Sequence, residues 1–154
     1  MVQPSYYTKK RIYEVKMHLL KPLLFIWQLP QNLLGLILCF VERAKKRQVF
    51  GISYYEAKKP GPFMKYCAIS LGSFIIADAA VADKESLLHE SGHQRQSLVL
   101  GPFYLLVIGL PSVTGNLMDR LLHKKWSGER RERWYHALPW EKSADRLGGL
   151  KAKN

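Results

Sequence analysis

Two histidines and a glutamate, in the stretch His89-Glu90-Ser91-Gly92-His93, have the residue types and the spacing of a metal site. Residues four apart lie about one turn apart on the same face of a helix, so both imidazoles can reach one ion. Glu90 lies about 100° around the helix from His89, where its carboxylate can reach a metal-bound water without binding the metal. Zinc lowers the pKa of such a water from about 15.7 to about 7, and the glutamate can then accept the proton. The motif therefore predicts Zn²⁺ bound by His89 and His93, with Glu90 as the general base.

A second short helix is predicted over residues 139 to 147, because Pro139 occupies its first position and two glycines follow its end. Glu141 and Asp145 are four residues apart and share one face of this helix. An apolar stripe on another face contains Trp140, Ala144 and Leu147. The helix thus carries two carboxylates that a two-histidine site, which still needs a third ligand, could use.

The two helices together resemble those of the gluzincin-type metallopeptidases, the thermolysin-like group. In that group a downstream helix supplies a glutamate ligand, and an aspartate one turn later holds a zinc histidine by its other ring nitrogen. The resemblance implies that Glu141 is the third zinc ligand, that Asp145 orients His89, and that the reaction is hydrolysis of a peptide or protein substrate. It covers only the two helices, and the remainder of the chain is unlike thermolysin.

A second resemblance continues from the motif through Gln94 to Ser97 and into the apolar segment 100–112. These stretches look like those of small bacterial membrane-associated proteins that join an HExGH helix to an apolar LGP…YLLVIG…PS segment and a late WEK-AD-LGG helix. The similarity implies that the two halves of the site belong together, but it brings no substrate.

Other assignments stay open at this point. The rivals of Glu141 as third ligand are His136, Asp119 and His123. A fourth protein ligand would make the site structural, whereas three ligands and a water leave it open for catalysis; a general base such as Glu90 favours the open form. The alternative function is therefore a non-enzymatic membrane-associated protein with a structural metal. For an enzyme, Tyr135 and His136 are the candidates to stabilise the oxyanion.

The sequence predicts one domain, residues 1–154, with an α+β fold. Its expected zincin-like minimal core contains a small sheet, the motif helix over about 84–97 and the Glu141 helix over 139–147. Strand patterns fill residues 51–77, and 70–76 is the candidate edge for holding an extended peptide. Asp83 is the expected N-cap of the motif helix, with Glu85 in the first turn. Gly92 costs about 1 kcal/mol in helix propensity, which a close approach by another element would explain.

Two apolar segments, about 19–41 and 98–118, predict association with a membrane. Both carry basic residues on both sides, and both contain proline or polar residues, so we expect broken or re-entrant hairpins that dip into the cytoplasmic leaflet and pack together. The competing interpretation places both segments in the core of a soluble protein.

The formal net charge of +12 restricts the partners more than the fold. Because no nucleic-acid-binding signature appears and the basic clusters flank the apolar segments, an anionic membrane surface is the expected partner and nucleic acid is not. Cys39 and Cys67 match no zinc spacing and are expected to be reduced thiols. With no signal-peptide cleavage pattern, they place the protein on the cytoplasmic side. Residues 151–154 are expected to be a disordered tail.

Overall fold

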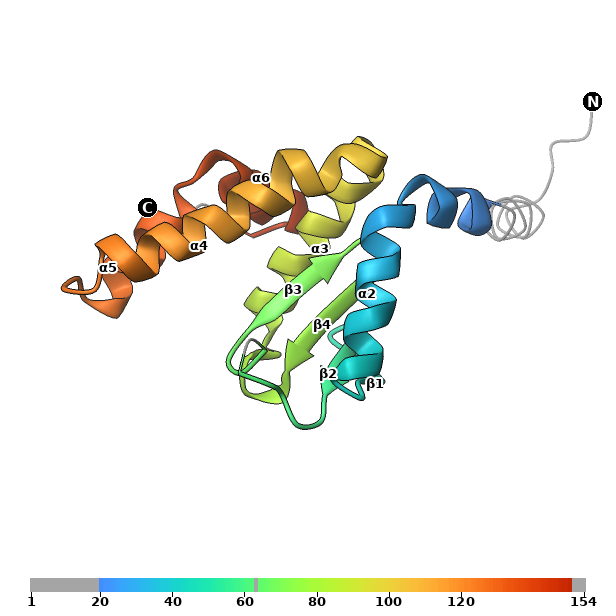
Figure 1. Cartoon of the computed structure of the whole chain (residues 1–154), viewed down its shortest axis with the longest axis horizontal. Helices are drawn as coiled ribbons and strands as arrows, with labels where there is room; N and C mark the ends of the chain where they lie inside the picture. Colours follow the sequence, from blue (N-terminus) through green and yellow to red (C-terminus); the bar gives the residue numbers. More distant parts are fainter. Residues whose placement is uncertain (1–19, 63, 151–154) are drawn as a thin grey trace, which may run out of the picture.

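The computed structural model describes residues 20–62 and 64–150, and it has an α+β architecture in which a mixed sheet lies between helices (Figure 1). Its strands are β1 (Lys45–Val49), β2 (Ile52–Ala57), β3 (Ala68–Leu71) and β4 (Phe74–Asp78). They are ordered β1-β2-β4-β3, with β2 parallel to β4 and the two outer pairs antiparallel. The strands predicted in residues 51–77 are confirmed, but the candidate edge 70–76 is wrong in part, because only β3 lies at an edge and β4 is paired on both sides. β1 was missed, because its four exposed residues Lys45–Gln48 form part of a basic cluster.

Helices cover both faces of the sheet, α2 (Leu29–Val41) on one and α3 (Lys84–Leu100) on the other. The central strand β4 is buried along its whole length, and its side chains alternate between the two faces. Phe74 and Ile76 pack on the side that Leu38 of α2 covers, whereas Ile75 packs with Leu87 of α3. The sheet thereby fixes α3, the helix with the histidine motif, against the core.

After α3 the chain turns at Gly101, whose φ of +54° favours glycine. It continues through a 3₁₀ turn, η2 (Gly101–Phe103), a π-helical turn, η3 (Leu105–Gly109), and α4 (Leu110–Leu122). The re-entrant hairpin expected in residues 98–118 is therefore wrong. Pro111 falls at the start of α4, directly after the π-helical turn, and such turns accommodate local distortion within a continuous helix.

The first apolar segment is broken as predicted. The helix Leu20–Trp27 meets α2 at an angle of 90°. The two apolar segments also contact one another, since Trp27 donates its indole N–H to the carbonyl of Leu98 at 3.0 Å. By length and composition, the 18 residues Leu105–Leu122, with a mean hydropathy of 1.2, could cross a membrane, as could the bent pair. Residue 19 and the predicted tail 151–154 lie outside the described residues.

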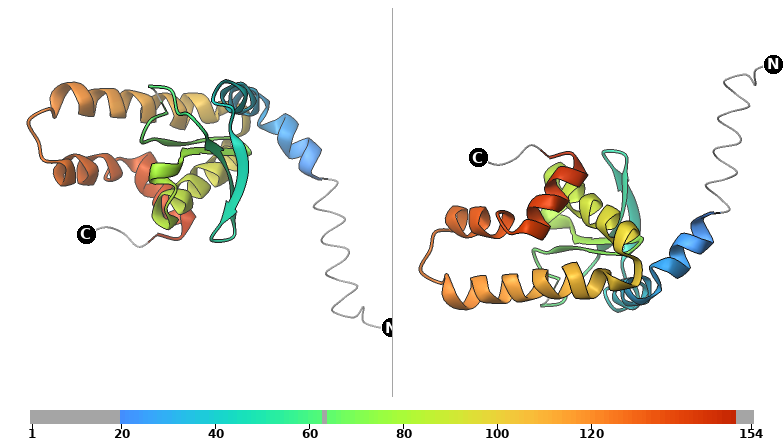
Figure 2. Two further views of the ribbon diagram at one scale, coloured as in Figure 1. Left: turned by 90° about the horizontal axis from the view of Figure 1, so that it is seen from below. Right: turned by 90° about the horizontal axis from the view of Figure 1, so that it is seen from above.

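The last two helices, α5 (Gly128–His136) and α6 (Pro139–Gly148), return along the molecule so that α5 runs beside α4 and α6 beside α3 (Figure 2). A short 3₁₀ turn, η1 (Ala79–Val81), joins the sheet to α3. Cys39 and Cys67 are free thiols, and burial raises the pKa of Cys39 to about 11, which favours the thiol form.

Candidate metal centre

Helix α3 begins where the sequence predicts. Asp83 caps it by accepting a hydrogen bond from the backbone N–H of Ser86 at 2.9 Å, and Glu85 lies in the first turn. The helix then runs for 17 residues and buries Leu87 together with the polar side chains of the motif. His89 and His93 consequently lie on one buried face, which is turned towards α6.

Close backbone packing brings α6 against that face. A Cβ atom placed on Gly92 would lie 1.9 Å from the carbonyl oxygen of Ala144, and one on Gly148 would lie 2.1 Å from that of Leu88. Only glycine therefore allows the two helices to meet at either point. The predicted reason for Gly92 is confirmed, and the approach carries Glu141 to the two histidines.

Three ligand atoms converge between α3 and α6. The Nε2 atoms of His89 and His93 lie 3.1 Å apart, and each lies 3.1 Å from Oε2 of Glu141. A tetrahedral ion with bonds of about 2.0 Å holds its ligand atoms about 3.3 Å apart, so the three positions fit zinc. Glu141 is only 1 % exposed, which leaves its carboxylate little water to interact with.

The outer nitrogen of each imidazole has an acceptor of its own. Oδ1 of Asp145 lies 2.6 Å from Nδ1 of His89, the contact that the resemblance implies. Oε1 of Gln96 lies 2.7 Å from Nδ1 of His93, and the amide N–H of Gln96 is donated to the carbonyl of Trp140 at 2.8 Å. Acceptors at both Nδ1 atoms fix the proton there in neutral imidazoles, so both Nε2 lone pairs point at Glu141. Three lone-pair atoms at 3.1 Å repel one another unless a metal ion or shared protons lie between them.

Two polar contacts at the site were missed in the sequence. Gln96 lies three residues after His93, on the same helical face, which is a signal that spacing could have revealed. Ser112 of α4 donates its hydroxyl to Oε1 of Glu141 at 2.6 Å. No local pattern marks Ser112, because α4 reaches Glu141 only through the tertiary fold.

Glu90 is buried beside this cluster but does not belong to it. Burial raises the pKa of Glu90 above its ordinary value, and the two nearby histidines only partly oppose this. A carboxyl group held in this way is suited to take up and release a proton.

The pKa values of the three ligand side chains depend on one another. Burial alone lowers the pKa of His89, but hydrogen bonds to Glu141 and Asp145 and the charge of Glu90 outweigh it and raise that pKa to about 9. The pKa of His93 is raised for similar reasons. Burial acts to raise the pKa of Glu141, yet its hydrogen bonds to the two histidines and to Ser112 hold it below its ordinary value. Without metal, the cluster therefore retains protons in place of the ion.

The rival ligands lie elsewhere. Asp119 and His123 pair with each other at 3.2 Å, and Arg131 donates two hydrogen bonds to Asp119. His136 faces the opposite side of Asp145, with its Nδ1 atom 3.2 Å from Oδ2. It forms a second possible ligand group with His89 and Asp145, on the side of His89 that faces away from Glu141.

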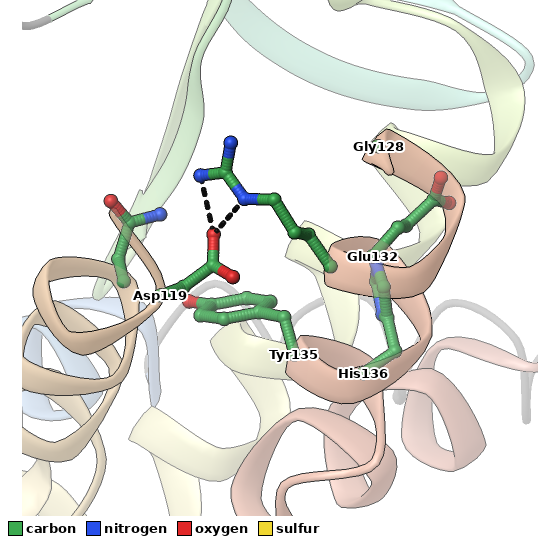
Figure 3. Close-up of a pocket in the computed structure, with 7 residues that line it drawn as sticks. Asp119, Gly128, Glu132, Tyr135 and His136 are labelled. Carbon is green, nitrogen blue, oxygen red and sulfur yellow. Dashed lines mark hydrogen bonds and ion pairs between the residues drawn. The ribbon is translucent and has the colours of Figure 1, made fainter. Parts of the chain in front are cut away.

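Tyr135 and His136, the candidates for oxyanion stabilisation, lie on the wall of a cavity of about 260 Å³ between α4 and α5 (Figure 3). The other lining residues are Asn116, Asp119, Gly128, Arg131 and Glu132. Burial and the neighbouring Glu141 raise the pKa of Tyr135, so its hydroxyl stays protonated as a donor. Its oxygen lies 3.5 Å from the carbonyl of Ser112, next to the Glu141 contact.

Comparison with known proteins found no matching family model, no matching curated protein and no matching solved structure.

Proposed function

We propose that this protein is a zinc-dependent peptide hydrolase, associated with a membrane on its cytoplasmic side. The convergence of the Nε2 atoms of His89 and His93 on Oε2 of Glu141, all at 3.1 Å, is the observation that carries the proposal. Asp145 lies against His89 as it would in a gluzincin-type site, so the contacts agree with that resemblance at four residues.

Zinc bound by these ligands would lower the pKa of a water to about 7 and polarise a carbonyl group. Glu90 is the buried carboxyl group that accepts the proton of the attacking water and then delivers it to the leaving amine. Tyr135 is our first candidate for the donor to the oxyanion, because its hydroxyl is protonated and adjacent to Glu141. His136 ranks second, because it contacts Asp145 on the side of His89 that faces away from Glu141.

A structural metal site is the second candidate function. Structural zinc normally has four protein ligands, whereas in residues 20–62 and 64–150 the group around Glu141 contains three. Three ligands in this part of the chain, together with a buried glutamate beside the cluster, favour catalysis over a purely structural role.

Membrane association is supported by the apolar helices and by the basic residues at their ends. Lys21 lies in the first turn of the bent pair, Arg43 follows that pair, and Lys124 and Lys125 follow α4. Such flanks attract an anionic lipid surface, and an excess of basic residues is typical of the cytoplasmic side. Nucleic acid is not an expected partner.

The test compares Glu90→Gln with Glu85→Gln, an exposed position on the same helix. Zinc content is measured by elemental analysis, and hydrolysis is measured with a fluorogenic peptide library. We expect about one zinc per chain in both variants. Hydrolysis should be lost only in Glu90→Gln, since its amide cannot act as a base.

Hydrolysis that persists in Glu90→Gln would refute the assigned base. A wild type that binds zinc but cuts no peptide, and whose melting temperature falls in His93→Ala, would establish the structural alternative. No zinc after chelator-free purification would refute both.

A further inference from the structure

Helix α2 has its polarity reversed. Gln31 and Asn32 are 0 % exposed and face the protein, whereas Ile37 and Phe40 are 59 % and 85 % exposed. In water the amide side chains would occupy the outer face and the apolar ones the core. A helix with its polar side inward is one whose outer surroundings are apolar.

The inward side chains of α2 are held by specific hydrogen bonds. Gln31 donates to the hydroxyl of Ser97 at 3.0 Å and to the carbonyl of Gly101 at 2.8 Å, and Ser97 donates to Gln28 at 2.8 Å. Asn32 accepts from the backbone N–H of Ser73 at 2.7 Å. These bonds fix the rotation of α2, so the outward position of its leucines is a property of the fold.

The segment η3–α4 shows the same reversal. Its inward residues include Ser112, which contacts Glu141, and the buried Asp119. Five apolar residues form an exposed stripe on its outward side, namely Leu106, Leu110, Val113, Leu117 and Leu121, and the exposed Arg120 lies near the end of that stripe. No charged residue occurs in α2 or between Leu98 and Met118. Figure 2 shows α2 and α4 along the same side of the molecule, with the β1–β2 hairpin reaching towards the other.

The helix beside α4 argues against an α4 that crosses a bilayer. Helix α5 runs beside it and exposes charged side chains, among them Glu129, Arg130 and Arg133. A membrane-crossing α4 would carry these charges into hydrocarbon, where each costs several kcal/mol. An in-plane α4 keeps α5 on the water side. Helix α2 has 13 residues, too few for the about 20 that a span needs.

We propose that the outward faces of α2 and η3–α4 form one surface that docks on an anionic lipid bilayer, and that the substrates are polypeptides anchored in that same bilayer. The substrate class rests on the proposed peptidase function. Only the width of α4 separates the metal ligand Glu141 from the docked face, because Ser112 contacts Glu141 while the adjacent Val113 is 63 % exposed.

The distance between the metal centre and the lipid surface limits which part of an anchored polypeptide can be cut. A helix is about 10 Å across, so the metal centre lies about 10 Å from the lipid. An extended chain covers about 3.3 Å per residue, so a substrate that passes around α4 needs at least about three residues to reach the site. A segment just outside a membrane anchor therefore meets the ligands, and anchoring raises its local concentration.

A bilayer fits the surface better than a second copy of the chain does. Pairing two copies through these faces would bring together their basic flanks, and each chain carries a formal net charge of +12. Anionic headgroups at the rim instead neutralise Lys21, Arg43 and Lys124 while acyl chains cover the leucines.

The first experiment measures binding to vesicles of phosphatidylcholine alone or with about 30 mol % phosphatidylglycerol. The variants are Ile37→Glu and Val113→Glu, with Phe50→Glu as the matched control in the β1–β2 turn. We expect both docking variants to bind the mixed vesicles at least about tenfold more weakly, with the control unchanged. Equal binding by all four proteins would overturn the docking surface. So would a lipid-free dimer that Val113→Glu dissociates.

The second experiment offers one sequence in two forms, a free peptide of about 12 residues and the same peptide directly after a single-span leucine–alanine helix in the vesicles. We expect the anchored form to be cut at least about tenfold faster, near the anchor, and not by Glu90→Gln. Equal rates would overturn the substrate class and leave the peptidase standing. Cleavage of neither form, with zinc and vesicle binding intact, would overturn the peptidase and its substrate class but leave the docking surface standing.

Discussion

Replacing Gly92 with alanine tests whether backbone contact between α3 and α6 sets the ligand geometry. The new Cβ would lie 1.9 Å from the carbonyl oxygen of Ala144 and 2.9 Å from its Cα. These are backbone atoms of a helix, so no side-chain rotation relieves the overlap. Since such contacts stay above 3.0 Å, α6 must retreat by about 1 Å and take Glu141 with it.

The magnitude follows from two opposing terms. Overpacking costs about 1–3 kcal/mol, and alanine regains about 1 kcal/mol of helix propensity, so the free energy of unfolding falls by about 0–2 kcal/mol. At this chain length that lowers the melting temperature by up to about 8 °C. Metal binding is more sensitive, because ligand distances tolerate only about 0.2 Å. We expect zinc affinity to fall by about 100-fold or more.

The assay is competition for zinc against a chromophoric chelator, with melting temperatures of the metal-free proteins measured in parallel. Gly128→Ala is the matched control: Gly128 begins α5, and a Cβ atom placed on it would meet nothing within 4 Å. Gly148→Ala should resemble Gly92→Ala, since its Cβ would lie 2.1 Å from the Leu88 carbonyl oxygen. Wild-type zinc affinity in Gly92→Ala, with an unchanged or higher melting temperature, would refute the reasoning.

Three further predictions concern the same centre. Gln96→Leu removes the acceptor at Nδ1 of His93, so zinc affinity should fall about 10- to 100-fold in the same competition assay; an unchanged affinity would show that Gln96 does not orient the ring. Ser112→Ala removes one hydrogen bond to Glu141, so titration calorimetry should show a smaller loss of zinc affinity, about three- to tenfold. A loss larger than that of Gln96→Leu would contradict this ranking of the two contacts. Folding raises the pKa of His89 from 6.5 to about 9, so its protonation stabilises the metal-free fold below pH 6.5 and this contribution is lost as the pH rises to about 9. The melting temperature of metal-free protein should fall across that window, and one that stays level would contradict the coupling.

The parts of the structure that short-range rules govern were predictable from the sequence. The cap at Asp83, the proline at the start of α6 and the four-residue spacings of both helices depend on neighbours within one or two turns. The motif even implied a close approach at Gly92, since glycine inside a helix needs a reason.

Tertiary contacts account for what the sequence did not reveal. Ser112 becomes part of the site only because α4 passes over α6, and the parallel pairing of β2 with β4 joins strands that are separated along the chain. Pro111 appeared to break its segment, yet its position in the helix, which is a property of the folded chain, made it harmless.

The buried polar residues of α2 connect that helix to α3, which carries the metal-binding histidines. Gln96 and Ser97 are adjacent on α3 and have different partners. Gln96 contacts His93, whereas Ser97 bonds to Gln31 of α2 and to Gln28 just before that helix. On the far side of the centre, α4 holds Glu141 through Ser112. Helix α4 is therefore hydrogen-bonded to the ligand Glu141, and α2 is hydrogen-bonded to Ser97, the neighbour of Gln96 on α3. The outward apolar side chains of these helices can contact lipid, while their inward polar side chains hydrogen-bond to the metal ligand Glu141 or to α3. We expect this reversed polarity where a buried polar site lies only one helix away from a membrane.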